Sequence, residues 1–151
     1  MKAEKNQFIP KEFIHIEFIQ DKSIKKKNIK KILSELSNKE CFDCGQKNPE
    51  YISLNNGIFI CRICAIIHRQ FPEEVSSIRQ NINSLTDKEL LILYKGGNQK
   101  LSNFVTYEFP GLQNYTPEIL YKTKAMDYYR ERLKYYSGMS TKPFKPNDLL
   151  A

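Results

Sequence analysis

The stretch CFDCGQKNPEYISLNNGIFICRICAIIHRQ, residues 41–70, contains all four cysteines of this 151-residue chain. They form two C-x2-C pairs separated by sixteen residues: Cys41, Cys44, Cys61 and Cys64. Each pair can place two sulfurs around one ion from a tight turn, and four thiolates complete the tetrahedral shell of a zinc ion. No position remains for water, so the spacing predicts one structural Zn²⁺. An iron–sulfur cluster and a redox-active pair are the alternatives.

Composition supports a folded chain in a reducing compartment. Apolar residues make up 40 % and aromatic residues 12 % of the sequence, which fits one domain with a short extension and excludes a disordered chain. No apolar run approaches the roughly 18 residues of a membrane span, and the first residues lack the apolar core of a signal peptide. We therefore expect a cytoplasmic protein whose cysteines bind metal and form no disulfides.

The net charge of +7 is concentrated before the cysteines, in DKSIKKKNIKK (21–31). A charge run of this kind is typical of a solvated helix face. An anionic membrane surface and an acidic protein are the other possible partners. The membrane-binding candidates are Lys25, Lys26, Lys27, Lys30 and Lys31.

Local patterns predict short strands and several helices, and hence an α+β fold. Alternation over 12–18 indicates a strand, and Asn55-Asn56-Gly57 indicates a hairpin turn. A helix should follow from Arg62 to about Gln70 and end before Pro72. The lead-in helix should bury one apolar face made of four residues: Ile29, Ile32, Leu33 and Leu36.

Further helices are predicted after the cysteine region. Thr86 and Glu89 form a capping-box pattern, and Gly96-Gly97 should end that helix. A helix over 100–107 and a last helix within 116–138 complete the set. The last helix should bury Leu120, Met126, Tyr129, Leu133 and Tyr136. We divide the chain into a basic extension (1–38), a four-cysteine domain with a small hairpin among helices (39–137), and a loose tail (138–151).

Two residues after the last cysteine carry possible chemistry. For His68, we favour a packed side chain hydrogen-bonded to backbone over a fifth ligand or an acid–base group, because four cysteines already fill the zinc shell. Arg69 is either an ordinary surface arginine or a guanidinium held in a fixed direction by the rigid zinc knuckle. A guanidinium presents a planar fork of donors that suits phosphate.

The residues together resemble the zinc module of the Arf GTPase-activating proteins, the ArfGAP family. The family pattern is C-x2-C-G, then N/D-P-x-W-x-S, then G-x3-C-x2-C, then x3-H-R. The chain matches both cysteine pairs with the family gap, and it also matches Gly45, Pro49, Ser53, Gly57, His68 and Arg69. Gly96-Gly97-Asn98 and YKTKAMDYYRERL (121–133) resemble the later helices, the second most closely those of the Golgi coat-associated branch.

This resemblance implies a protein that binds a GTP-loaded Arf-family GTPase and stimulates GTP hydrolysis. Arg69 would be the arginine finger, and the GTPase would supply Mg²⁺ and the water-positioning glutamine. GTPase contacts would include Tyr51, Arg62, Ile66 and Arg79. The branch resemblance implies a peripheral location at Golgi or vesicle membranes and coat proteins as further partners.

The sequence also departs from the family pattern. Tyr51 replaces its tryptophan, Ile66 a small glycine and Pro72 a later glycine, and two further departures are Arg62 and Ser84. These differences motivate a second hypothesis, a non-catalytic ArfGAP-like binding module. The basic charge keeps a third open, a nucleic-acid-binding zinc finger, although the apolar helix AIIHRQF (65–71) does not suit reading of base edges.

Overall fold

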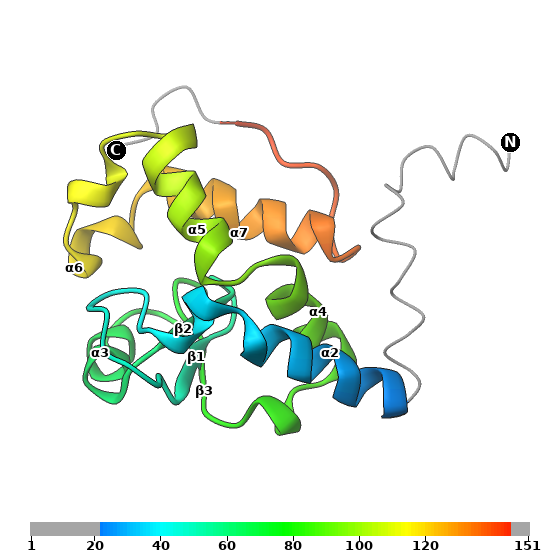
Figure 1. Cartoon of the computed structure of the whole chain (residues 1–151). Helices are drawn as coiled ribbons and strands as arrows, with labels where there is room; N and C mark the ends of the chain where they lie inside the picture. The colour runs from blue at the N-terminus through cyan, green and yellow to red at the C-terminus, as the bar shows by residue number, and fades with distance from the viewer. Residues whose placement is uncertain (1–21, 146–151) are drawn as a thin grey trace, which may run out of the picture.

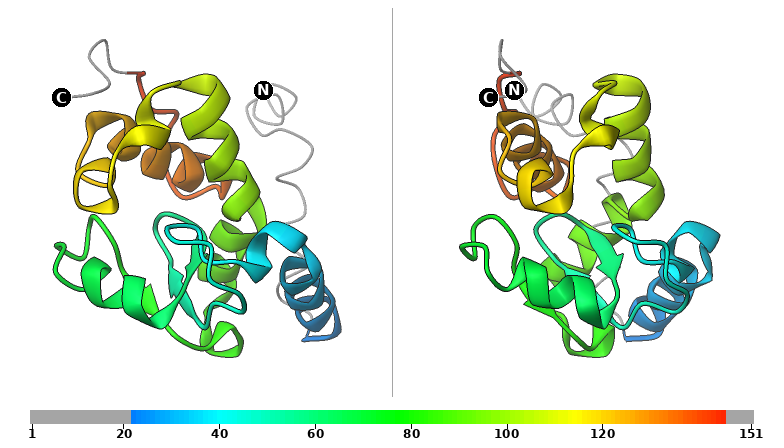
Figure 2. Two further views of the ribbon diagram at one scale, coloured as in Figure 1. Left: turned by 60° about the vertical axis from the view of Figure 1, so that its left-hand side comes forward. Right: turned by 90° about the vertical axis from the view of Figure 1, so that its left-hand side faces the viewer.

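The computed structural model describes residues 22–145, so the strand expected over 12–18 lies outside the described part. A small sheet lies at the centre of the lower half of the molecule, between α3 (Arg62–His68) and α2 (Lys22–Ser34) (Figure 1). Helices α5, α6 and α7 form a second layer above it, and both further views show the same arrangement (Figure 2). The fold is the α+β class predicted from the sequence.

The sheet has three antiparallel strands in the order β2-β1-β3. Strands β1 (Tyr51–Ser53) and β2 (Ile58–Ile60) form the predicted hairpin, in which Ile52 pairs with Phe59. Gly57 adopts a φ of +65° in the turn, a conformation that glycine adopts without strain. The third strand, β3 (Ile78–Arg79), was not predicted, because two residues are too few to show an alternating pattern.

Alternation along β2 separates two hydrophobic cores. Ile58 and Ile60 face a core that contains three cysteines and the helices of the upper layer. Phe59 faces the opposite way, into a second core with Ile52 of β1 and Ile29 of α2. Successive strand residues point to opposite faces, so a three-residue strand can serve both cores.

Six helices surround the sheet in the described range. Besides α2 and α3 they are α4 (Asp87–Lys95), α5 (Asn98–Asn103), α6 (Pro117–Leu120) and α7 (Lys124–Tyr136). Short 3₁₀ turns cover Leu36–Lys39, Ile82–Ser84 and Leu112–Asn114, and a π turn over Phe104–Glu108 extends α5. No helix in the described range is long and apolar enough to cross a membrane.

The capping signals of α4 are confirmed. The Thr86 hydroxyl accepts from the Glu89 backbone N–H at 3.2 Å, and the Glu89 carboxylate accepts from the Thr86 N–H at 2.9 Å. The last predicted helix is instead two helices, because the chain turns after α6 and Thr123 caps α7 by accepting from the Met126 N–H. Residues 141–145 form no helix or strand.

The predicted apolar face of the lead-in helix is only half right. Ile29 and Ile32 are buried, whereas Leu33 is 44 % exposed and Leu36 is 80 % exposed. The helix ends at Ser34, before Leu36 can complete the face. Leu33 lies about 100° further round the helix than Ile32 and lines a hollow at the edge of the second core, beside Ile52 and Phe59.

Asn98 connects three segments at the start of α5 and is buried. Its side-chain oxygen accepts from the Phe59 N–H at 2.7 Å, and its amide donates to the carbonyls of Ser37 and Glu40 at 3.0 and 2.7 Å. Its own backbone N–H donates to the Asn38 side chain at 2.9 Å. These bonds attach the chain before the first cysteine to the edge of β2.

We predict that Asn98→Ala lowers the free energy of unfolding by at least about 2 kcal/mol, because it leaves buried backbone groups unpaired. Asn103→Ala, an exposed change on the same helix, is the matched control and should stay within about 0.5 kcal/mol of wild type. Urea titration followed by circular dichroism measures both. Equal midpoints and slopes for the two variants would contradict the role assigned to Asn98.

Candidate functional site

The four cysteines come together in one cluster, as their spacing predicts. All four sulfurs lie within 4.8 Å of one another, and the Cys44 and Cys61 sulfurs are 3.6 Å apart. Tetrahedral coordination with metal–sulfur bonds of about 2.3 Å would place sulfurs about 3.8 Å apart. Cys44 is exposed while the other three are buried, and all four are free of disulfides. This donor set fits a single metal ion.

Backbone hydrogen bonds shape both metal-binding turns. In the first, the Cys41 N–H donates to the Gln46 carbonyl at 2.7 Å, and Gly45 adopts a φ of +82°. The Phe42 N–H donates to the Phe59 carbonyl and joins this turn to β2. In the second, the Cys61 sulfur accepts from the Cys64 N–H at 3.5 Å and so caps α3. The second pair therefore belongs to the helix that leads to Arg69.

Without a cation, two of the three buried thiols resist ionisation, whereas hydrogen bonds from the Cys64 backbone and the neighbouring cysteines lower the pKa of the third, Cys61, although its burial acts the other way. Burial raises the pKa of Cys41 to about 11. Burial, together with the nearby Cys41, raises the pKa of Cys64 much further. Metal binding requires thiolates, so a bound cation must displace these protons. The cluster is therefore a site where metal binding and thiol ionisation occur together.

His68 is fully buried, as expected, but its partners are side chains and not backbone groups. Its Nε2 lies 2.7 Å from the Asp43 carboxylate, and its Nδ1 lies 2.6 Å from the Ser76 hydroxyl. A carboxylate only accepts, so Nε2 carries the proton that it donates. Both ring nitrogens are occupied, which leaves His68 no position from which to bind the metal.

The hydrogen bonds of His68 continue across the buried centre of the molecule. Ser76 bonds to Ser53 at 2.6 Å, and the Asn56 amide donates to Ser53 at 2.9 Å. The Arg130 guanidinium then donates to the Asn56 oxygen at 3.0 Å and to the Tyr121 carbonyl at 3.2 Å. This chain of side chains links α3, the hairpin and α7.

Asp43 closes this network beside the cysteine cluster. Its second carboxylate oxygen accepts from the Tyr121 hydroxyl at 2.5 Å. Burial and the Asp43 charge raise the pKa of Tyr121 well above its usual value, so the phenol remains a donor. Sequence reasoning missed Asp43, although its place between Cys41 and Cys44 was a signal that it would lie close to the second cysteine pair.

Arg69 is exposed at the carboxyl end of α3, directly after the buried His68. Its backbone N–H donates to the Ala65 carbonyl at 2.9 Å, which places it on the last helical turn. Its guanidinium carbon lies 5.3 Å from the centre of the Tyr51 ring. Arg69 and Tyr51 therefore lie together, while Arg62 and Ile66 are exposed elsewhere on the same helix.

Arg79 differs from the other candidate GTPase contacts because it is engaged within the protein. Its guanidinium bonds to the Glu89 carboxylate at 2.5 Å and is only partly exposed. Bonds from the Thr86 backbone and Arg79 lower the pKa of Glu89, although its partial burial acts the other way. Arg79 thus joins β3 to the capping box of α4.

The candidate lysines of α2 also divide into two groups. Lys25 is partly buried, donates to the Leu85 carbonyl at 3.0 Å and lies 3.8 Å from the Asp87 carboxylate. The other four are exposed: Lys26, Lys27, Lys30 and Lys31.

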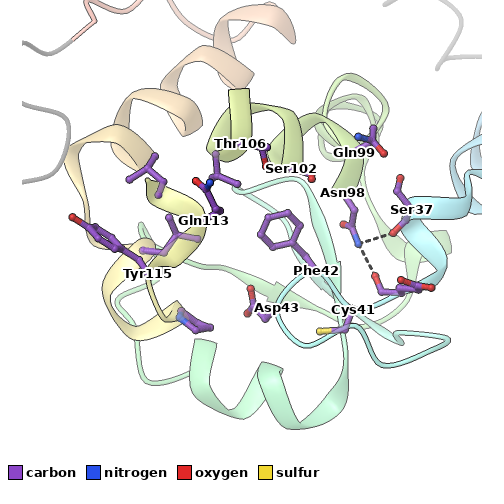
Figure 3. A pocket seen from close by; sticks show the side chains of 15 residues that line it. Ser37, Cys41, Phe42, Asp43, Asn98, Gln99, Ser102, Thr106, Gln113 and Tyr115 are labelled. Atoms are coloured by element: carbon purple, nitrogen blue, oxygen red, sulfur yellow. Dashed lines mark hydrogen bonds between the residues drawn. The ribbon is translucent and has the colours of Figure 1, made fainter. Parts of the chain in front are cut away.

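A cleft of about 350 Å³ lies beside the first metal-binding turn (Figure 3). Phe42 points into it, and Asp43 and Cys41 lie at its lower edge in the figure. Its upper wall is uncharged and includes Ser102, Thr106 and Gln113. Arg69 is not among its lining residues, so the cleft is separate from the exposed arginine.

Comparison with known proteins gives one consistent family. A family model described as "Putative GTPase activating protein for Arf" matches residues 26–138. ADP-ribosylation factor GTPase-activating protein 3 of Bos taurus is 32 % identical over 114 residues, which cover 74 % of this chain and 22 % of that protein. GCS1 of Saccharomyces cerevisiae, also named an ADP-ribosylation factor GTPase-activating protein, is 39 % identical over 69 residues, 45 % of this chain and 20 % of that protein.

The fold has a solved counterpart. A crystal structure titled as a putative GTPase-activating protein for ADP ribosylation factor from Cryptosporidium parvum superimposes with a TM-score of 0.65 at 24 % identity, over 76 % of this chain and 92 % of that one. The chain spans only about a fifth of the length of the curated relatives named above. The matched region contains the four-cysteine cluster and the His68-Arg69 pair, and on this evidence the chain belongs to the ArfGAP family.

Proposed function

We propose that this protein binds a GTP-loaded Arf-family GTPase and accelerates GTP hydrolysis by inserting Arg69. The observation that carries the proposal is the exposed position of Arg69 at the end of α3. This helix begins at two of the clustered cysteines, and its last residue is His68, which is hydrogen-bonded to Asp43. Family membership supports the choice of an Arf-family GTPase as the partner.

The chemistry requires a fixed positive charge. In phosphoryl transfer the negative charge spreads over the γ-phosphate oxygens, and an arginine supplied in trans stabilises it. A guanidinium stays charged at any physiological pH and offers two parallel donors to two oxygens. Arg69 has no ion-pair partner among the described residues, so its donors are available to a phosphate. The GTPase would supply Mg²⁺ and orient the attacking water.

The departures from the family pattern leave the helix intact around Arg69. Ile66 is 53 % exposed and lies within the unbroken α3. Pro72 follows the helix and accepts backbone bonds from Val75 and Ser76 without interrupting α3. We propose Arg62, Ile66 and Tyr51 as contacts with the GTPase, because the first two share the exposed face of α3 and the third packs against Arg69.

We further propose that the metal is one structural zinc ion. Four thiolates satisfy zinc completely, and the ion would supply rigidity and not chemistry. The network from Asp43 through His68 would then hold the end of α3 against the rest of the domain. A displacement of about 1 Å at a reacting group can lower a rate by roughly 100-fold, so this rigidity matters for Arg69.

We also propose that the protein works in the cytoplasm at Golgi or vesicle membranes, with coat proteins as further partners. The likeness of 121–133 to the Golgi coat-associated branch supports this location. Fluorescent tagging together with a Golgi coat marker in the native cell would test it, and a uniformly nuclear signal would contradict it.

Arg69→Lys should lower the GAP-stimulated rate of single-turnover GTP hydrolysis by about 10³-fold or more, because lysine cannot reproduce the guanidinium fork. Binding of the GTPase should change little, since the charge is retained. Gln70→Ala, at the exposed neighbouring residue, is the control and should keep the wild-type rate. Wild-type activity in Arg69→Lys would rule out the finger. GTPase binding without any stimulation by the wild type would favour the non-catalytic module.

Removal of the metal should unfold the domain around the cysteines. Purified protein should contain one zinc per chain by elemental analysis, and a strong chelator should lower the thermal midpoint. Cys44→Ser should weaken zinc binding, because a hydroxyl is a poor zinc ligand. Affinity should also fall as the pH falls, since protons compete for the thiolates. Iron or an iron–sulfur absorption spectrum would contradict the zinc assignment.

Asp43→Asn should weaken the hydrogen bond that holds His68 in place, and it should leave every exposed GTPase contact unchanged. An amide cannot accept from both His68 and Tyr121 as the carboxylate does, so we expect a loss of about 1–3 kcal/mol of stability. The catalytic rate at saturating GTPase should fall more than the apparent affinity. Zinc content is the control and should remain one per chain. A fall in affinity alone would show that Asp43 does not position Arg69.

A further inference from the structure

The outward face of α2 is a concentrated cationic surface at one edge of the molecule. Lys26, Lys27, Lys30 and Lys31 are all exposed there. In Figures 1 and 2, α2 and α3 lie on opposite sides of the small sheet, so this surface is remote from the helix that carries Arg69. The proposed GTPase function does not use it.

A hollow of about 640 Å³ opens on this face, between α2 and the end of α4. The described residues that line it include three lysines and two polar residues of α2, with Tyr94 of α4 opposite: Lys27, Asn28, Lys30, Lys31, Ser34 and Tyr94. The Lys31 ammonium lies 5.4 Å from the centre of the Tyr94 ring. No carboxylate belongs to the lining within the described residues, and the nearest along α2 is Glu35, just after the helix ends.

Asn28 is a buried donor without a partner in this wall. The residue is more than nine-tenths buried, at 8 % exposure, and its enclosed Nδ2 has no hydrogen-bond partner among residues 22–145. Buried amides are normally paired, so an unpaired one at a hollow indicates a missing acceptor. The Ser34 hydroxyl donates to the Lys31 carbonyl at 2.8 Å and so helps to order this turn of the helix.

The hollow therefore offers donors to an anion. Three lysines line a single space, with Asn28 in its wall, whereas Lys25 is turned inward towards Leu85 and Asp87. A phosphate monoester carries close to two negative charges and three acceptor oxygens near neutral pH, and such a group matches this set of donors. The volume exceeds that of one phosphate and accommodates a sugar-like ring that bears it.

Two exposed leucines distinguish a membrane lipid from a soluble phosphate. Leu36 is 80 % exposed just beyond the helix, and Leu33 is 44 % exposed one helical turn from Lys30, on the flank of α2 that faces Pro49. Apolar side chains beside a row of lysines suit the boundary between lipid headgroups and acyl chains. A free phosphate or a nucleic acid would leave both leucines in water.

We propose that the hollow between α2 and α4 binds the phosphorylated inositol headgroup of an anionic membrane lipid, with Lys27, Lys30 and Lys31 as its donors and Asn28 in its wall. The surface acts by recognising a phosphate monoester and not by charge alone. It would hold the protein on a membrane while α3 faces another side of the molecule. The inference does not depend on the activity of Arg69.

The test is sedimentation of the full 151-residue chain with vesicles. Phosphatidylcholine vesicles carry either phosphatidylserine or a phosphatidylinositol phosphate, at matched total charge. Wild type should bind the second at least fivefold more tightly, and a soluble inositol phosphate should compete. Lys27→Gln/Lys30→Gln should lose about fivefold per lysine. Lys124→Gln/Lys142→Gln removes the same charge from exposed sites outside α2 and should bind as wild type.

Asn28→Asp places a carboxylate of the same shape in the wall of the hollow, where it repels a phosphate, and should abolish the preference between the two vesicles. Thermal melts verify that each variant is folded. If Asn28→Asp does not fold, the lysine variants alone test the proposal. Equal binding of wild type to both vesicle types overturns the proposal, as does unchanged binding by Lys27→Gln/Lys30→Gln. Binding to RNA with no vesicle binding overturns it too. Arg69→Lys should leave vesicle binding unaltered, so this result and the failure of the arginine finger are separable.

Discussion

Four sulfurs within 4.8 Å of one another are the constraint on which the rest of this structure depends. Three of them are buried, and burial opposes the ionisation of Cys41 and Cys64 unless a cation lies between the sulfurs. For the four sulfurs to meet at one point, the turn that holds Cys41 and Cys44 must pack against β2. The hairpin must then bring the chain back so that Cys61 and Cys64 lie beside the first pair. The position of α3 follows, because Cys61 and Cys64 form its first turn.

The network around His68 extends this constraint from the metal site to the whole domain. Asp43 lies between two cysteines and accepts from α3 at one oxygen and from Tyr121 at the other. At the other end of the network, Arg130 of α7 donates a hydrogen bond to Asn56 in the hairpin turn. Every link is a hydrogen bond between buried groups, and an unmade bond there would be costly. The end of α3 is consequently anchored on both sides, while Arg69 one residue later is exposed.

Two surfaces with different chemistry lie on either side of the sheet. On α3, the exposed Ile63 and Ile66 accompany Arg62 and Arg69, which suits a protein partner with an anionic reacting group. On α2, lysines surround a hollow with a buried amide, which suits a headgroup. The separation allows both to be occupied at once. A GTPase activator that works on a membrane would need that arrangement.

Much of the fold was predictable where the signal is local. Thr86 and Glu89 predicted the start of α4, and Asn55-Asn56-Gly57 predicted the hairpin turn, because each motif forms its bonds within a few residues. Strand β3 and the break before α7 were not predicted. A two-residue strand exists only through its pairing with Ser53 and Ile52, and the turn after α6 depends on packing of the fully buried Tyr121.

The sequence by itself determined which four cysteines form the cluster, the family and the identity of the exposed arginine. Cysteine spacing is a covalent property, and tetrahedral coordination admits few alternatives to it. Only the tertiary structure decided the partners of His68, the burial of Asp43 and the division of the α2 lysines into one engaged and four exposed. These depend on residues brought together from distant parts of the chain, as Asp43 and Tyr121 are across 78 positions. No local pattern encodes such a contact, because it forms only when both cores are packed.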